Sequence, residues 1–388
     1  MLKVFSDVAK NVRLKPKDIS IDNLGFKLHY RFTFGILVVC CVLVCSRQYI
    51  GEHIRCITHN VPGHVIDTYC FVLGTFTVPT FENKTTNAVS DLYAHPGVGP
   101  AGPHASEEDY IMAHLYYQWI PFLLFGQALL FYLPHFIWKN HEGSRLYALC
   151  DGFQKAVFVL KLDSTRSAEK VESLRKHFQA LKRFKVNRDW GRVLVMCEWL
   201  NLFNVILQFY LTNWYLGSNF LTLGLKLYDG NYDEIFDKMF PKVAKCTFHQ
   251  YGPSGTLQSF DSLCVLALNI INEKIYLFLW FWFALMLVVS VLSIFWRLLT
   301  CCLLSRSTDF NQLLLWETSP GSRLDRHDVA VITKESSFYD WLFLYYIGKN
   351  LKGALFRELL HELAADFEKE HLLIFIKMFY TGKKTHWI

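Results

Sequence analysis

The sequence predicts an all-α membrane protein: a four-transmembrane-helix bundle with disulfide-stapled extracellular loops, a small β element and a cytoplasmic helical domain. Three observations predict it: four long apolar segments, basic residues gathered in three of the segments around them, and four cysteines in the other two. Hydrophobic residues make up 52% and aromatic residues 16% of the 388-residue chain. This share is too high for an ordinary soluble protein.

Four segments have the length of roughly 17–25 mainly apolar residues that a membrane-spanning helix needs. They are residues 28–50, 116–138, 193–216 and 275–296. Arg31 and Arg47 leave 15 uncharged residues between them in the first segment. Because arginines near helix ends extend to the lipid headgroups, this segment still predicts a span. The first apolar run follows a charged amphipathic lead, so we expect it to stay as a span and not to be cleaved as a signal peptide.

The distribution of Lys and Arg predicts the orientation. Residues 1–31, 139–192 and 297–388 hold 7, 13 and 12 basic residues, whereas 47–115 and 216–274 hold 3 and 5, together with seven and six acidic residues. Cytoplasmic segments of membrane proteins carry the excess of positive charge. We therefore expect both termini and the middle loop in the cytoplasm, with the net charge of +6 facing anionic lipids and not nucleic acid.

The cytoplasmic segments contain three helical patterns. Leu2, Val4, Phe5, Val8 and Val12 lie among lysines, which suits an amphipathic helix either on the inner leaflet or folded into a pore mouth. Apolar residues at helical spacing in 171–184 and 355–367 predict two helices of a cytoplasmic domain.

The expected organisation is an N-terminal helix (1–27), the first span (28–50), extracellular loop 1 (51–115), the second span (116–138), a helical cytoplasmic loop (139–192), the third span (193–216), extracellular loop 2 (217–274), the fourth span (275–296) and a C-terminal cytoplasmic helical domain (297–388).

Cysteines agree with this topology. Cys56, Cys70, Cys246 and Cys264 lie in the two extracellular loops, where an oxidising environment favours disulfides. Four cysteines allow three pairings, and their spacing does not choose among them. Zinc is the alternative, but these loops contain no short C-x₂-C pair, which favours disulfides. The remaining seven cysteines lie in spans or cytoplasmic segments, where thiols stay reduced.

The extracellular loops contain two further signals. Residues 245–251, rich in Thr, Phe and Tyr, precede Gly252-Pro253-Ser254-Gly255, which predicts a short strand and a turn. Asn83 begins the N-x-[ST] sequon Asn83-Lys84-Thr85, a possible glycosylation site whose use the sequence leaves open.

Glu198 is an acidic residue well inside the third predicted span. Asn201, Asn204 and Gln208 extend it into a polar stripe on one helix face. An intramembrane acid indicates either a functional site or interhelical hydrogen bonding. The second interpretation is favoured, because no complementary charge recurs in the other predicted spans. The sequence shows no catalytic constellation, so we expect no enzyme, no cofactor and no metal site.

Tyr116-Tyr117-Gln118-Trp119, at the start of the second predicted span, resembles the signature of the innexins, the invertebrate gap-junction proteins. Further matches, in chain order, are Arg47 to Gly51 with Cys56, Phe240-Pro241-Lys242, Lys245 to His249, Tyr251 to Gly255, Cys264 to Phe283, Asp340-Trp341 and Gly348-Lys349-Asn350. The chain departs from the family pattern at Gly51-Glu52-His53, Cys70-Phe71 and Glu142-Gly143-Ser144-Arg145.

The resemblance implies a subunit of a large-pore gap-junction channel in the plasma membrane, which passes ions and small molecules between cells through two docked rings. It implies an octameric ring of identical or different innexin subunits, a docking ring on the neighbouring cell and contact with membrane lipid. It also implies the disulfide pairs Cys56–Cys264 and Cys70–Cys246. Two alternatives stay open: a non-junctional hemichannel like the related pannexins, and a four-span adhesion or scaffold protein.

Overall fold

The computed structural model describes residues 22–51, 54–58, 61–78, 98, 112–150, 164–217, 220–228, 232–302, 304–318, 324–351 and 353–381. Most of the expected N-terminal helix, and Asn83, lie outside these residues. The chain divides into two compact units. One contains residues 1–24, 135–199 and 292–388, and the other contains residues 25–134 and 200–291.

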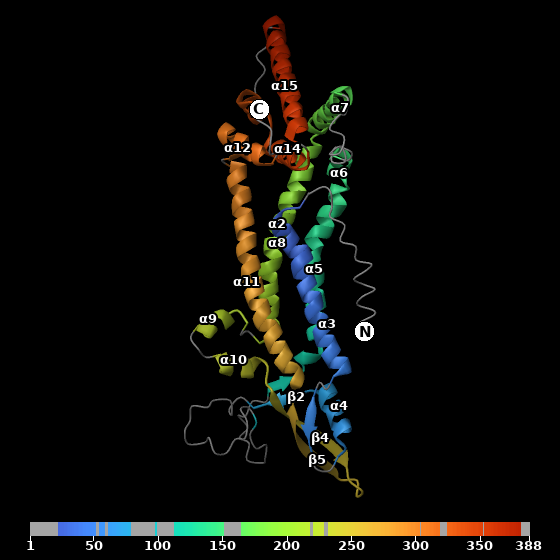
Figure 1. Cartoon of the computed structure of the whole chain (residues 1–388). Helices are drawn as coiled ribbons and strands as arrows, with labels where there is room; N and C mark the ends of the chain where they lie inside the picture. The colour runs from blue at the N-terminus through green and yellow to red at the C-terminus, as the bar shows by residue number, and fades with distance from the viewer. Residues whose placement is uncertain are drawn as a thin grey trace. The chain divides into compact units, whose positions relative to one another are not determined.

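Within these described residues, four helical segments are long and apolar enough to cross a membrane, as the sequence predicts. They are Leu24–Ile50, α5 (Ile120–Glu142), α8 (Val186–Tyr215) and α11 (Ala267–Cys302) (Figure 1). The helices α8 and α11 extend beyond the apolar segments that predict them, because regular helix continues into flanking polar residues. The boundary between the two units falls within α5, α8 and α11.

The first of these segments changes its helical form along its length. It comprises α2 (Leu24–Lys27), the π-helical η1 (Leu28–Thr33) and α3 (Phe34–Ile50). The Thr33 hydroxyl donates to the Leu28 carbonyl at 3.0 Å and accepts from the Trp282 indole at 3.0 Å. A π-helical turn is rare and is frequent at functional sites.

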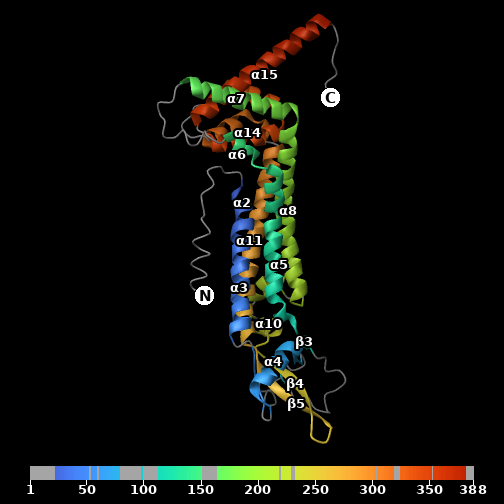
Figure 2. The same cartoon turned by 90° about the vertical axis from the view of Figure 1, so that its right-hand side faces the viewer.

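The unit of residues 25–134 and 200–291 contains a five-stranded antiparallel sheet in the order β1-β5-β4-β2-β3. The strands are β1 (Arg55–Ile57), β2 (Thr75–Thr77), β3 (Met112–His114), β4 (Val243–Tyr251) and β5 (Leu257–Val265). The unit also holds α4 (Gly63–Leu73), the 3-10 turn η3 (Tyr116–Gln118), α9 (Leu223–Tyr228) and α10 (Tyr232–Met239). Figures 1 and 2 show β4 and β5 as a long hairpin beside α4.

The hairpin confirms the strand and turn expected near residue 251 and adds β5, which pairs with β4 from Val243↔Val265 to Tyr251↔Leu257. The helix of the second span begins at Ile120, after η3, and not at Tyr116. Pro121 occupies the first turn of this helix, where a residue without a backbone N–H is tolerated. The signature residues of 116–119 therefore belong to the turn that leads from β3 into α5.

The other unit is helical. Its elements are the ends of α5, α8 and α11 with α6 (Arg145–Cys150), α7 (Ser164–Arg183), η5 (Leu304–Arg306), α12 (Thr308–Thr318), α13 (Arg326–Glu335), α14 (Phe338–Asn350) and α15 (Gly353–Thr381). The two amphipathic patterns of the sequence form α7 and α15, which pack together (Figure 2). Arg175 pairs with Asp366 across this contact. Trp190 packs edge-on against Trp138, Phe343 and Tyr346 in the core of the unit.

Candidate functional site

Two disulfides join the sheet to the segments around it. Cys56 of β1 bonds Cys264 of β5 directly opposite it in the strand register, and Cys70 of α4 bonds Cys246 of β4. This is the pairing that the family resemblance implies. Each bond links the segment between the first two spans to the segment between the last two. The two segments therefore form one cross-linked body.

Non-covalent contacts support the same body. The Cys56 backbone N–H donates to the Asp67 carboxylate of α4 at 2.7 Å. Tyr69 of α4 packs edge-on against Phe248 of β4, with ring centroids 4.8 Å apart. These contacts hold α4 against both β1 and β4.

Gly74 connects α4 to β2. Its φ of +94° is one that residues with a Cβ rarely adopt, and a Cβ there would lie 2.8 Å from the Leu115 side chain. The glycine therefore lets the chain reverse direction directly behind the helix that carries Cys70.

Two of the four signature residues donate hydrogen bonds to this body. The Tyr117 hydroxyl donates to the Cys70 carbonyl at 3.3 Å, and the Gln118 amide donates to the carbonyls of Phe71 at 2.5 Å and Val72 at 3.1 Å. These are among the last carbonyls of α4. Those of Phe71 and Val72 have no partner within the helix, whereas that of Cys70 also accepts from the Gly74 backbone N–H at 3.1 Å. The signature therefore caps α4 at the end that carries Cys70.

Tyr116 and Trp119 complete the signature. The Tyr116 hydroxyl accepts from the Asn269 amide of α11 at 3.0 Å, and its carbonyl accepts from the Tyr215 hydroxyl of α8 at 2.5 Å. Trp119 is exposed. Tyr116 therefore ties the sheet to the ends of two candidate spans.

We expect Gln118→Met to lower the free energy of unfolding by about 1 kcal/mol, because the carbonyls at the end of α4 lose a donor while the packed volume is retained. The thermal unfolding midpoint of the purified protein in detergent measures this. Gln250→Met, on an exposed position of β4, is the matched control and should leave the midpoint unchanged. Equal midpoints for the two variants would contradict this role of Gln118.

His114 on β3 is a buried histidine, although its place in an extracellular loop suggested a solvated side chain. Its Nε2 lies 2.7 Å from the hydroxyl of Thr77 on the neighbouring strand β2. In the register of these two strands, Thr77 is paired with Met112. Burial lowers the pKa of His114 to about 4. The imidazole is therefore neutral in the folded protein at physiological pH.

The lowered pKa of His114 predicts acid sensitivity. Between pH 6.5 and about 4 the unfolded chain binds a proton at this residue and the folded chain does not, so stability falls as the pH falls through this window. The loss has an upper limit of about 3 kcal/mol. We expect His114→Gln to flatten the change in melting temperature between pH 7 and pH 5, whereas His249→Gln, at an exposed site on β4, should keep the wild-type slope.

The second candidate site is a buried ion pair in the helical unit. Glu198 of α8 accepts two hydrogen bonds from the Arg297 guanidinium of α11, at 2.8 and 2.6 Å. The Asn23 amide donates to the same carboxylate at 2.7 Å, and the Tyr346 hydroxyl of α14 donates to the Asn23 side-chain oxygen. We call these four residues, Asn23, Glu198, Arg297 and Tyr346, the Glu198 cluster. It connects α8, α11, the residue before the first candidate span and α14 of the C-terminal region.

The hydrogen bonds from Arg297 agree with the interhelical hydrogen bonding favoured for Glu198, but the reason for that interpretation is wrong. No complementary charge was expected in the spans, but Arg297 supplies one. The fourth apolar segment ends at residue 296, so Arg297 was counted with the cytoplasmic basic residues, whereas α11 continues to Cys302. The signal that was available is helical periodicity: Arg297 follows the buried Ile294 and precedes the buried Thr300 on one helix face.

Asn201, Asn204 and Gln208 are buried on α8, as an interhelical polar stripe predicts. The Gln208 amide donates to the Asn204 side-chain oxygen at 3.0 Å. Next to this stripe, the Gln127 amide of α5 donates to the Thr212 hydroxyl of α8 at 2.8 Å. A further buried pair, which the sequence analysis missed, joins His29 of the π-helical turn to Ser290 of α11 at 2.9 Å.

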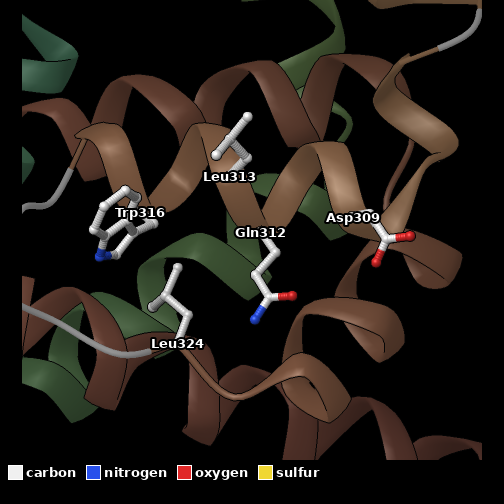
Figure 3. Close-up of a pocket in the computed structure, with 5 residues that line it drawn as sticks. All are labelled: Asp309, Gln312, Leu313, Trp316 and Leu324. Carbon is white, nitrogen blue, oxygen red and sulfur yellow. The ribbon is translucent and has the colours of Figure 1, made fainter.

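The structure also contains a pocket of roughly 470 Å³ beside α12. It is lined by Asp309, Gln312, Leu313, Trp316 and Leu324, and Figure 3 shows Gln312 and Trp316 extending from the helix toward Leu324. Its one charged group, Asp309, pairs with Arg326 at 2.7 Å. The apolar lining, of which Leu313 and Trp316 are exposed, and the paired carboxylate offer no convergent polar groups for a small ligand.

The sulfurs of Cys56, Cys70 and Cys264 lie within 4.8 Å of one another, a spacing that resembles a metal site. All three are disulfide sulfurs. Because metals bind the thiolate form of cysteine, this cluster is a structural cross-link and not a zinc site.

Known proteins match nearly the whole chain. A family model described as Innexin matches residues 22–367. The chain is 42% identical to "Innexin inx7" of Drosophila melanogaster over 95% of its length and 85% of the relative's. It is 38% identical to "Innexin inx2" of Schistocerca americana over 96% and 100%, and 34% identical to "Innexin shaking-B" of Drosophila melanogaster over 94% of each.

Proposed function

The chain belongs to the innexin family of gap-junction channel proteins, and from this we propose that it is a subunit of a large-pore channel that joins adjacent cells through two docked rings. Ions and small molecules pass along a water-filled path, which needs electrostatic bias and no dehydrating filter. By family resemblance each ring is octameric. The rings lie in the plasma membrane and contact its lipid.

The cross-linked sheet carries this proposal. Three of its strands lie in residues 55–77 and 112–114, which precede α5 in the sequence. The other two lie in residues 243–265, between α8 and α11 in the sequence. A sheet built from both connecting segments requires them on the same side of the membrane. The disulfides favour the oxidising, extracellular side. This supports an extracellular sheet and cytoplasmic termini, in agreement with the excess of basic residues in the other segments.

The hairpin supplies a surface for docking. The turn at residues 252–256 and the exposed side chains of Tyr251 and Leu257 lie at its tip, away from the disulfides. Two cross-links hold the base of the hairpin, so its tip is presented in a fixed conformation. A surface ordered in advance loses less conformational entropy on binding. We propose that the tips of facing subunits meet between the two cells.

Residues 1–27 are proposed to lie at the cytoplasmic pore entrance. The Glu198 cluster supports this, because Asn23 is bonded on one side to Glu198 and on the other to Tyr346. The end of the N-terminal segment therefore has a fixed point of attachment next to the first span.

Paired-cell recording tests the proposed function. Two communication-deficient cells that both express only this chain should show junctional conductance and dye transfer, and pairs in which one cell expresses it should show neither. Conductance in single cells without coupling in pairs would favour the hemichannel, and no conductance in reconstituted bilayers would favour the adhesion protein. Repeating the pairs with Asn83→Gln separates a docking failure caused by a glycan from a lack of docking capacity.

A further inference from the structure

The free cysteines of this chain differ sharply in exposure. Cys40, Cys150 and Cys197 are buried and Cys41 and Cys45 are partly buried, whereas Cys301 and Cys302 are exposed. The two exposed thiols are adjacent and are the last two residues of α11. A buried thiol is shielded from modifying enzymes, so the exposed pair is the accessible one.

The end of α11 has two distinct faces. Ile294, Arg297 and Thr300 are buried on one face, where Arg297 joins the Glu198 cluster. The opposite face presents the exposed side chains of Phe295, Leu298 and Cys302, at positions i, i+3 and i+7. Residues with this spacing lie along one face of a helix. Cys302 therefore continues an exposed apolar stripe of a membrane-spanning helix to its end.

We propose that Cys301 and Cys302 are sites of reversible S-acylation by a long-chain fatty acid. Juxtamembrane cysteines of this kind suit the modification, because the attached chain enters the bilayer beside the helix that carries it. The proposal rests on the orientation given above, which places the C-terminal end of α11 at the cytoplasmic surface, where acyl-coenzyme A is available. Arg306 follows the pair within one short turn and suits the anionic inner leaflet.

The reaction is a thioester exchange without oxidation or reduction. The cysteine sulfur attacks the carbonyl carbon of a long-chain acyl-coenzyme A, a new carbon–sulfur bond forms, and the bond between that carbon and the coenzyme A sulfur breaks. The thiol proton of the cysteine is transferred to the released coenzyme A. Neighbouring residues of an α-helix point about 100° apart, so the two thiols reach separate strips of the helix surface.

Acyl exchange on the full-length protein tests the proposal. Membranes of cells expressing the tagged chain are reduced and alkylated to block every thiol, treated with hydroxylamine to cleave thioesters, and labelled with a maleimide polymer. We expect a hydroxylamine-dependent shift of one or two labels. The double variant Cys301→Ala/Cys302→Ala should lose the shift, and Cys45→Ala, which removes a partly buried thiol, should keep it.

Antibody access to a C-terminal tag, measured on the same cells, separates the outcomes. If the tag is accessible only after permeabilisation and the shift is absent, the proposed acylation is overturned and the proposed orientation is kept. A shift that survives in the double variant overturns the assignment to Cys301 and Cys302. A tag accessible on intact cells overturns the orientation and the acylation together.

Discussion

Arg297→Met is expected to destabilise the protein by about 3–5 kcal/mol, because it removes one partner of a buried ion pair and leaves the other charge without compensation. The side chains of Arg297 and Glu198 are 10% and 5% exposed. Among the residues that the structure describes, Asn23 then remains as a donor to the carboxylate, and its neutral amide does not balance the charge. The midpoint of thermal unfolding in detergent and the amount of protein at the cell surface should both fall.

The chain offers a matched control for this change. Arg326 pairs with Asp309 at 2.7 Å, nearly the same distance, but these side chains are 70% and 76% exposed. An exposed pair contributes about 0–1 kcal/mol, so Arg326→Met should be nearly neutral. The double variant Glu198→Gln/Arg297→Met removes both charges and should recover most of the loss. If Arg297→Met and Arg326→Met behave alike, burial does not determine the strength of the cluster.

Hydropathy and charge were sufficient to predict the four spans, because both depend on long stretches of sequence and not on tertiary contacts. Hydropathy and charge predict the residues at which the helices end less accurately. The fourth apolar segment stops before Arg297, whereas α11 continues for more than another turn, since backbone hydrogen bonds do not depend on side-chain hydropathy. The short α4 and the strand β5 were missed for a different reason: both are held by partners distant in sequence, including two disulfides.

In the candidate sites, too, the sequence identifies single residues but not their distant contacts. The signature at residues 116–119 was identified by resemblance, but its capping of α4 joins residues 46 and 47 positions apart and needed the structure. Glu198 was singled out as an intramembrane acid, yet its partners Asn23 and Arg297 are 175 and 99 positions away. His114 carries no pattern of its own. A polar residue is recognised from the sequence, but its partner is set by the packing of helices that the sequence predicts only one by one.

Cys56→Ser is expected to abolish cell–cell coupling. It opens a cross-link between residues 208 positions apart, and loss of a native disulfide typically costs about 2–5 kcal/mol. It also frees the thiol of Cys264, whose sulfur lies within 4.8 Å of the Cys70 sulfur in the second disulfide. A thiolate this close can attack that bond and exchange partners. The exchange forms a non-native disulfide with Cys264 and releases one thiol of the second pair. The variant should therefore lose both native pairings at the base of the hairpin and show no junctional conductance in paired cells.

The double variant Cys56→Ser/Cys264→Ser separates the two causes, because it lacks the same cross-link but does not leave the Cys264 thiol beside the second disulfide. We expect it to retain the Cys70–Cys246 bond, which non-reducing peptide mapping detects, and to reach the cell surface in larger amount than Cys56→Ser. Equal loss in both variants would assign the defect to the missing cross-link, and normal coupling by Cys56→Ser would show that docking does not need the staple. Since the hairpin tip itself is unchanged in both, recovery of coupling in the double variant would mean that one disulfide suffices to present it.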